Sequence, residues 1–372
     1  MPNILTRSLL KATGLTQAGR LMDATRLIQR ALGGSVLPAS QPQTAPVIIL
    51  PGPPTQPTQR AQPTPIQQPA ANDDQAGKPH PNFSEQSFRF ENQTYPYRLF
   101  VPKAPEGLAW SADLAPMPLV VLLHGCKQDA LDFSKGTAMN ALAGDEQCLV
   151  LYPEQISRGN AQMCWNWFEP DHQQVGTGEP GMIAALTRQV LASDYNGRRA
   201  DPRRVYIAGL SAGGAMAAVV ARLYPDLFAA LGVHSGLAAG AAKSLVSAFS
   251  AMRSGAKGHK TQALPTIVFH GTADTTVNQE NGELVAQAAI TAFEAAGQSL
   301  VQSRTSSDMN GLNAERTVHS NGAGTPLVEN WRIAFGPHAW SGGSSQGSYT
   351  DANGPDASAA MLAFFLRHKQ GD

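Results

Sequence analysis

Residues 205–216 read Val205-Tyr206-Ile207-Ala208-Gly209-Leu210-Ser211-Ala212-Gly213-Gly214-Ala215-Met216. The first four are apolar and predict a buried strand, and Ala212–Leu223 predicts a helix. The G-x-S-x-G pattern between them is typical of a strand-to-helix turn that raises a serine hydroxyl above the sheet edge. So tight a turn leaves no room for side chains two residues from the serine, so glycine stands at both places. We interpret Ser211 as a nucleophile; the alternative is a glycine-rich turn that only packs closely.

Apolar runs alternate with amphipathic stretches along the rest of the chain. The predicted strands are a hairpin at 87–102 and runs at 118–123, 148–152, 229–233, 266–269 and 327–335. The other predicted helices are at 131–147, 181–192, 244–252, 284–296 and 356–367. Strands alternating with helices of this length predict an α/β fold, with a mostly parallel sheet covered by helices on both faces.

The chain also carries partners for the serine. A serine hydroxyl becomes nucleophilic when a base takes its proton and a third group orients that base. In elbow-type hydrolases these partners follow in the order Ser, Asp or Glu, His, each after a later strand. Asp274 follows the strand at 266–269, and His338 follows the strand at 327–335. The sequence therefore predicts a triad of Ser211, Asp274 and His338 at the carboxyl edge of the sheet.

Two backbone amides are candidates for an oxyanion hole. Ala212 begins the helix after the serine, and Cys126 follows the His-Gly pair that ends an early buried strand. Three further histidines, His124, His234 and His270, stand too early in the chain for the base. We interpret them as wall or packing residues.

Composition excludes some classes of function. The formal net charge is zero, which argues against bulk attraction to nucleic acid or to an anionic membrane. No apolar run approaches the ~20 residues of a membrane span. The three cysteines, Cys126, Cys148 and Cys164, fit no zinc pattern, and their odd number leaves at least one free thiol. We expect them to pack as small apolar residues, with any pairing left open, and we expect neither metal nor organic cofactor.

The front of the chain differs from the rest. Residues 1–34 predict two short basic amphipathic helices, residues 35–81 a disordered Pro/Gln-rich linker, and residues 82–372 the catalytic domain. The helices either dock on a partner or granule surface or form a solvated hairpin without a partner. Because residues 1–34 lack the apolar core and cleavage site of a secretory signal, we expect a cytoplasmic protein with reduced cysteines. A transit peptide, or secretion by a route without a recognisable signal, is the alternative.

Five motifs together resemble a known family. They are His124-Gly125-Cys126 with Gln128, Cys164-Trp165-Asn166-Trp167-Phe168, Gly209-Leu210-Ser211-Ala212-Gly213-Gly214, His270-Gly271-Thr272-Ala273-Asp274 with Val277, and His338-Ala339-Trp340-Ser341-Gly342-Gly343. In this order they resemble the polyhydroxybutyrate depolymerase-like esterases, which adjoin the feruloyl and acetylxylan esterases. The resemblance covers about residues 87–367. It implies an α/β-hydrolase fold, carboxylic ester hydrolysis and the same triad; Lys127 departs from it, since relatives often carry a small residue there.

Four aromatic residues belong to these motifs: Trp165, Trp167, Phe168 and Trp340. Aromatics beside a triad would form an apolar acyl or alcohol pocket. Ordinary core packing is the alternative for each of them.

The expected activity is that of a serine esterase acting through an acyl-enzyme on a small or oligomeric ester. Short-chain hydroxyalkanoate esters of the polyhydroxybutyrate type are the first expectation, and a feruloyl or acetylxylan carbohydrate esterase is the alternative. A peptidase, and a non-catalytic binding protein on a hydrolase fold, are further alternatives of other classes. No nucleic-acid partner is expected.

Overall fold

The computed structural model describes residues 82–104, 115–195, 197–309 and 312–371. Their main feature is an 11-stranded sheet. Its strands, in the order in which they lie side by side, are β1 (Phe83–Phe90), β2 (Gln93–Phe100), β4 (Leu149–Pro153), β3 (Met117–Leu123), β6 (Arg198–Leu210), β7 (Ala230–His234), β8 (Thr266–Gly271), β11 (Pro326–Ile333), β10 (Leu312–Ser320) and β9 (Val301–Met309). The short β5 (Asp194–Tyr195) pairs with β6, and β12 (Trp340–Ser341) pairs with β13 (Thr350–Asp351) apart from the main sheet.

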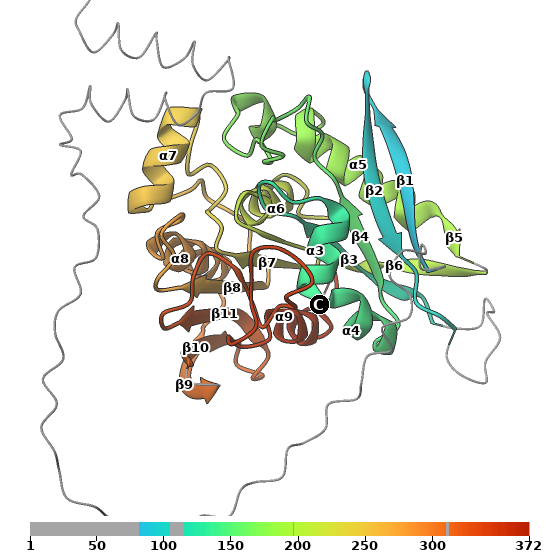
Figure 1. Ribbon diagram of the computed structural model, residues 1–372. Helices are drawn as coiled ribbons and strands as arrows, with labels where there is room; N and C mark the ends of the chain where they lie inside the picture. The colour runs from blue at the N-terminus through green and yellow to red at the C-terminus, as the bar shows by residue number, and fades with distance from the viewer. Residues whose placement is uncertain (1–81, 105–114, 196, 310–311, 372) are drawn as a thin grey trace, which may run out of the picture. The chain divides into compact units, whose positions relative to one another are not determined.

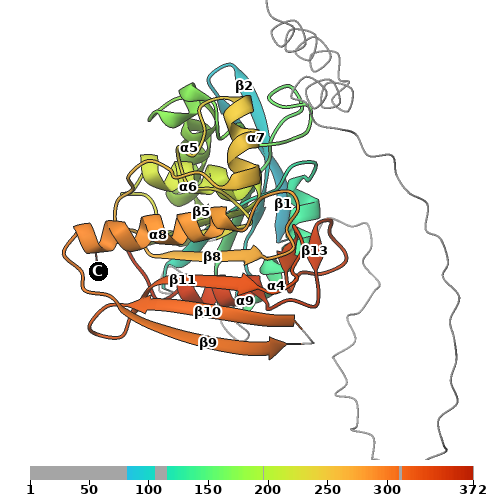
Figure 2. The same ribbon diagram turned by 90° about the vertical axis from the view of Figure 1, so that its left-hand side faces the viewer.

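The centre of the sheet is parallel and its two ends are antiparallel. Strands β4, β3, β6, β7, β8 and β11 all run in one direction. The hairpin β1–β2 joins one end and β10–β9 the other, both with antiparallel pairing. Figure 1 shows these two pairs at opposite ends, and Figure 2 shows β8, β11, β10 and β9 side by side. Parallel central strands need crossovers, and helices supply them.

Helices cover both faces of the sheet and enclose two apolar cores. One core lies under α5 (Gly178–Ala192), α6 (Ala212–Leu223) and α8 (Glu280–Ala295), and α7 (Leu245–Ser254) packs against it with one edge. The other lies under α3 (Ala130–Thr137), α4 (Met139–Asp145) and α9 (Ala357–Phe365). Strand β3 is buried along its whole length, as a strand between two helical layers must be. None of the helices that the structure describes is long and apolar enough to cross a membrane.

Most of the predicted elements are confirmed, one predicted helix needs correction, and two long strands were not predicted. The helix expected at 131–147 is two helices, because Ala138 takes a left-handed conformation (φ 51°) and caps α3 through its amide. The strands β9 and β10 had no counterpart in the prediction. They form a sheet edge of largely polar residues, so they lack the apolar pattern by which buried strands are found.

The predictions for residues 1–34 and 35–81 lie outside the described residues. The boundary near Asn82 coincides with the first described residue, and it stays a prediction.

Candidate active site

The carboxyl ends of the central strands meet along one edge of the sheet. In the parallel register Leu123 of β3 lies beside Gly209 of β6, Leu210 lies beside His234 of β7, and Gly271 of β8 lies beside Ile333 of β11. The residues that follow these strand ends therefore share one edge. Ser211, Asp274 and His338 are among them, which is where open α/β sheets hold their sites.

The turn at Ser211 has the geometry of a nucleophile elbow. Ser211 has φ 58° and ψ −120°, a conformation that non-glycine residues seldom adopt, and its amide donates to the His234 carbonyl at 2.9 Å. A Cβ on Gly213 would lie 2.2 Å from the Leu123 carbonyl oxygen, and one on Gly209 would lie 2.4 Å from the Gly213 backbone. Both glycines are required because backbone fills the space where a side chain would stand.

Asp274 and His338 form a hydrogen-bonded pair. His338 Nδ1 donates to Asp274 Oδ2 at 2.6 Å, and the carboxylate is fully buried. The other oxygen, Oδ1, accepts from the amides of Thr276 (2.9 Å) and Val277 (2.8 Å). Burial alone would raise the pKa of Asp274, but the hydrogen bonds from His270, His338 and the Val277 amide outweigh it and lower the pKa. The carboxylate is therefore ionised at any working pH.

A close approach of two loops brings this pair together. A Cβ on Gly271 would lie 2.1 Å from the Gly336 carbonyl oxygen, so only glycine lets the loop that carries His338 lie against β8. The Ala273 amide donates to that same Gly336 carbonyl at 3.0 Å. The structure thus brings Asp274 and His338 together, and both stand at the edge that holds Ser211. No hydrogen bond joins Ser211 to His338 within the described part of the chain; in apo sites this contact often tightens when substrate binds.

The two amides predicted for an oxyanion hole lie on neighbouring turns. The carbonyls of Leu123 and His124 lie against Gly213, so the Cys126 turn packs on the start of α6. In the described residues no acceptor takes the amide of Cys126 or of Ala212. Gln128 shapes the Cys126 turn, since its side-chain oxygen accepts from the Gly125 amide at 3.0 Å.

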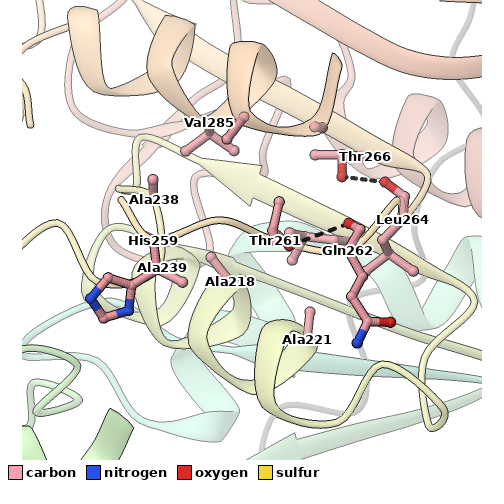
Figure 3. A pocket seen from close by; sticks show the side chains of 13 residues that line it. Ala218, Ala221, Ala238, Ala239, His259, Thr261, Gln262, Leu264, Thr266 and Val285 are labelled. Atoms are coloured by element: carbon pink, nitrogen blue, oxygen red, sulfur yellow. Dashed lines mark hydrogen bonds between the residues drawn. The ribbon is translucent and has the colours of Figure 1, made fainter. Parts of the chain in front are cut away.

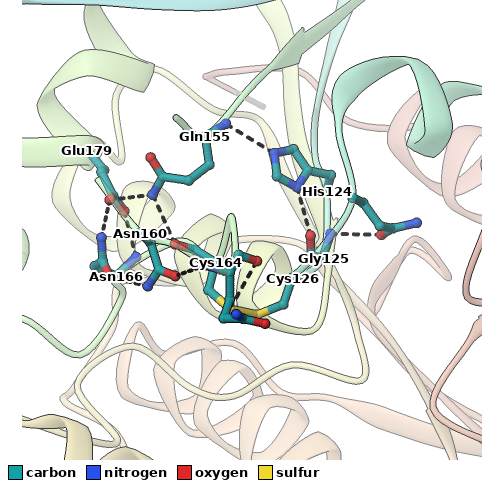
Figure 4. Close-up of a disulfide and its surroundings, with 10 residues drawn as sticks. His124, Gly125, Cys126, Gln155, Asn160, Cys164, Asn166 and Glu179 are labelled. Atoms are coloured by element: carbon teal, nitrogen blue, oxygen red, sulfur yellow. Dashed lines mark hydrogen bonds between the residues drawn. A yellow bond between two sulfur atoms is a disulfide. The ribbon is translucent and has the colours of Figure 1, made fainter. Parts of the chain in front are cut away.

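Two of the three cysteines, whose pairing the sequence left open, form a disulfide. Cys126 and Cys164 form a disulfide across a sequence separation of 38, whereas Cys148 is free and buried. The bond ties the candidate oxyanion turn to the loop around Cys164, as Figure 4 shows. Gln155 Nε2 donates to the Cys164 carbonyl at 3.0 Å and to the buried Glu179 at 2.5 Å. The pairing that the sequence left open is thus decided by the fold, which brings together two residues that no local pattern connects.

His124 and His234 are both fully buried and neutral. Burial lowers the pKa of His124 to about 4 and that of His234 to about 3. Each accepts an amide through Nε2: His124 from Gln155 at 3.1 Å, and His234 from Ser341 at 3.0 Å. Through these hydrogen bonds both histidines hold loops against strand ends, and His234 holds the segment that follows His338.

Comparison with known proteins assigns the family. The family model described as "Esterase PHB depolymerase" matches residues 104–293, about half of the chain. The chain belongs to this family.

Relatives of the esterase PHB depolymerase family extend the match. Poly(3-hydroxyalkanoate) depolymerase C of Paucimonas lemoignei is 34% identical over 232 residues, which cover 58% of this chain and 53% of that protein. Feruloyl esterase B of Thermothelomyces thermophilus is 31% identical over 187 residues, covering 45% and 62%. The chain spans about half the length of the first curated relatives it matches.

A solved structure supports the fold. An acetyl xylan esterase from Aspergillus awamori superposes with a TM-score of 0.54 at 18% identity, covering 76% of this chain and 99% of that chain. Together with the parallel centre of the sheet, this confirms the predicted α/β-hydrolase fold. That fold in turn implies a triad and an oxyanion hole at the strand ends.

The aromatic residues of this family member lie in the interior. Trp165 is fully buried, and Trp167, Phe168 and Trp340 are almost so. Trp340 donates to Ser358 and stacks on His234. This burial favours the packing alternative, and substrate contact by any of the four stays a prediction.

A cavity of about 30 Å³ lies elsewhere, under α6 and α8 (Figure 3). It is lined mostly by small apolar side chains, with His259 and Gln262 at its edge, and by none of the triad candidates. A space of this size holds roughly one or two waters, so it does not serve an ester substrate.

The sequence motifs include two side chains near the site, Gln128 and His270, whose contacts sequence reasoning did not assign. Gln128 joins the Cys126 turn to the loop after His338, because its amide donates to Asp132 at 2.9 Å and to the Ser348 carbonyl at 3.0 Å. His270 approaches Asp274 directly, with Nε2 3.3 Å from Oδ2. The signal for His270 was its place four residues before Asp274, across a turn that starts with glycine.

Proposed function

We propose that this chain is a serine esterase that hydrolyses carboxylic esters through an acyl-enzyme, with Ser211, Asp274 and His338 as its triad. The observation that carries the proposal is the 2.6 Å hydrogen bond from His338 to the buried Asp274, at the same sheet edge as the strained Ser211 turn. A serine exposed by a strained turn and an imidazole oriented by a carboxylate, both at one sheet edge, are the parts that nucleophilic catalysis by a serine uses.

The chemistry follows from these positions. His338 Nε2 takes the Ser211 proton as Oγ bonds to the ester carbonyl carbon, and the carbonyl oxygen becomes an anion. The amides of Cys126 and Ala212 donate to that oxyanion. As the carbon–oxygen bond to the alcohol breaks, His338 gives its proton to the leaving alkoxide. Water then attacks the acyl-enzyme with His338 again as base, which releases the acid and restores Ser211. Asp274 keeps the imidazole proton on Nδ1 throughout.

For the substrate we propose short-chain hydroxyalkanoate esters or oligomers, supported by the name of the Paucimonas lemoignei relative. The alternative is a feruloyl or acetylated carbohydrate ester, supported by the name of the Thermothelomyces thermophilus relative. The experiment compares kcat/KM on 3-hydroxybutyrate trimer, methyl ferulate, acetylated xylan and p-nitrophenyl butyrate. Preference for the trimer supports the first reading, and preference for methyl ferulate or acetylated xylan supports the alternative.

The same assay tests the nucleophile. Ser211→Ala should lower turnover of p-nitrophenyl butyrate by several powers of ten while the thermal unfolding midpoint stays close to that of the wild type, because triad members act as a unit. Near-normal turnover in Ser211→Ala would refute the triad and, with it, the proposed mechanism.

We further propose that residues 1–34, for which the sequence predicts basic amphipathic helices, dock on a partner or granule surface. A chain beginning at Asn82 should then hydrolyse p-nitrophenyl butyrate like the full chain and lose activity on dispersed polyester. Loss of activity on both substrates would show that the N-terminal residues serve the catalytic fold instead.

The Cys126–Cys164 disulfide bears on where the protein acts. A cytoplasmic location is the expectation from the sequence, but a disulfide persists mainly in oxidising compartments, so the Cys126–Cys164 bond favours secretion. Thiol titration of the denatured protein isolated from its host should find one reactive cysteine, Cys148; three would favour the cytoplasm.

A further inference from the structure

A second histidine contacts the candidate triad carboxylate. His270, the penultimate residue of β8, is almost fully buried, and its Nε2 lies 3.3 Å from Asp274 Oδ2. The same nitrogen lies 2.9 Å from the Val277 carbonyl oxygen. Two imidazoles, those of His270 and His338, thus approach one oxygen of one carboxylate.

The surroundings of His270 determine where its proton lies. Both atoms near Nε2, the Asp274 and Val277 oxygens, are acceptors, so Nε2 must carry a hydrogen. The other ring nitrogen, Nδ1, is buried and finds no partner among the described residues. It faces the backbone of α8 at Gly282, where an added Cβ would lie 2.8 Å from it. A hydrogen on Nδ1 would be buried without an acceptor, which costs about 1–3 kcal/mol.

We propose that His270 is a positioning residue: its single Nε2–H, which donates to the Val277 carbonyl at 2.9 Å, is shared with Asp274 Oδ2 at 3.3 Å and holds that oxygen in the place where it accepts from His338. This inference rests on the proposed esterase function. It assigns to His270 a role beyond the packing that the sequence indicated.

The hydrogen bonds of Asp274 explain why such a residue is needed. The amides of Thr276 and Val277 hold Oδ1 in place. The carboxylate can then still rotate about Oδ1, and this rotation would move Oδ2. His338 alone cannot hold Oδ2, because it stands on a loop and must itself be oriented by the carboxylate. A hydrogen-bond donor on the rigid strand β8 fixes the position of Oδ2, as residues that support a catalytic side chain do.

The experiment uses the full chain and two substitutions. In His270→Gln the side-chain Nε2 can still donate to Asp274, whereas His270→Met has similar length and no donor. We expect His270→Gln to keep kcat for p-nitrophenyl butyrate within about threefold of wild type. His270→Met should lose about 10- to 100-fold in kcat with KM unchanged, the effect of one lost hydrogen bond to a charged group. His319→Gln, on the distant strand β10, is the control for histidine replacement.

The readouts separate positioning from a structural role and from failure of the proposed function. Equal loss in the Gln and Met variants, or no loss in either, overturns the proposal. Histidine-selective ¹⁵N spectra of the wild type give a test that needs no variant: His270 should carry its proton on Nε2, and an Nδ1–H tautomer overturns the proposal. If wild type hydrolyses the ester and Ser211→Ala does not, the esterase function stands whatever His270 shows.

Discussion

Acidification should destabilise this protein through two buried histidines. The folded pKa of His124 is about 4 and that of His234 about 3, both lowered chiefly by burial from an ordinary value of 6.5. Between pH 6.5 and these values the unfolded chain binds protons that the folded chain cannot bind. The free energy of unfolding therefore falls as the pH drops below about 6.5, and keeps falling until the folded pKa values are reached.

The size of the effect follows from the same values. Each unit of pH decrease in this window lowers the free energy of unfolding by about 1.4 kcal/mol per histidine. At pH 5, about 1.5 units below the unfolded pKa, the two histidines together cost about 4 kcal/mol relative to pH 7.5. Glu179 acts in the opposite direction, because burial raises its pKa and favours the folded state as the pH falls. Asp274 adds little at pH 5, since its unfolded pKa of 3.8 lies well below.

Urea unfolding followed by tryptophan fluorescence at pH 7.5 and pH 5 measures this loss. The comparison is with a His124→Gln, His234→Gln double variant, whose side-chain oxygens can still accept from Gln155 and Ser341. Glu179 remains in both proteins, so the difference between them isolates the histidines. The double variant should lose about 4 kcal/mol less than wild type on acidification. An equal loss in the two proteins would refute the reasoning.

Three further outcomes are expected. Asp274→Asn should fold normally yet lower kcat by about 10⁴-fold, because the amide favours the wrong tautomer of His338. Steady-state kinetics on p-nitrophenyl butyrate measures this loss, and full activity would point to another carboxylate. Gly213→Ala should lower the free energy of unfolding by about 1–3 kcal/mol and remove most turnover, because the new methyl group would collide with the Leu123 carbonyl. Thermal unfolding measures the loss of stability, and an unchanged midpoint would contradict this close approach. Reduction of the Cys126–Cys164 disulfide, which closes a loop of 38 residues, should lower the free energy of unfolding by about 4 kcal/mol. Urea unfolding with and without dithiothreitol measures the change, and identical midpoints would argue against the disulfide.

The sequence alone predicted the features that short patterns encode. The apolar runs of β3, β6 and β8 indicated buried strands, because a strand between two helical layers has no polar face. The glycines around Ser211 indicated the elbow, because the steric demand of that turn falls on residues two positions away. The chain order of Ser211, Asp274 and His338 indicated which loops would meet at the carboxyl edge.

Tertiary structure decided what depends on contacts between distant residues. The Cys126–Cys164 pair, the bridge from Gln128 to Ser348 and the polar edge strands β9 and β10 carry no local signal. His270 stands close to Asp274 in sequence, yet its role depends on α8, whose Gly282 backbone covers Nδ1 and leaves Nε2 to face the carboxylate. A local pattern reports which side chains are apolar and where the chain turns. Which polar atoms meet is set by the packing of separate elements, and this determines where the protons lie.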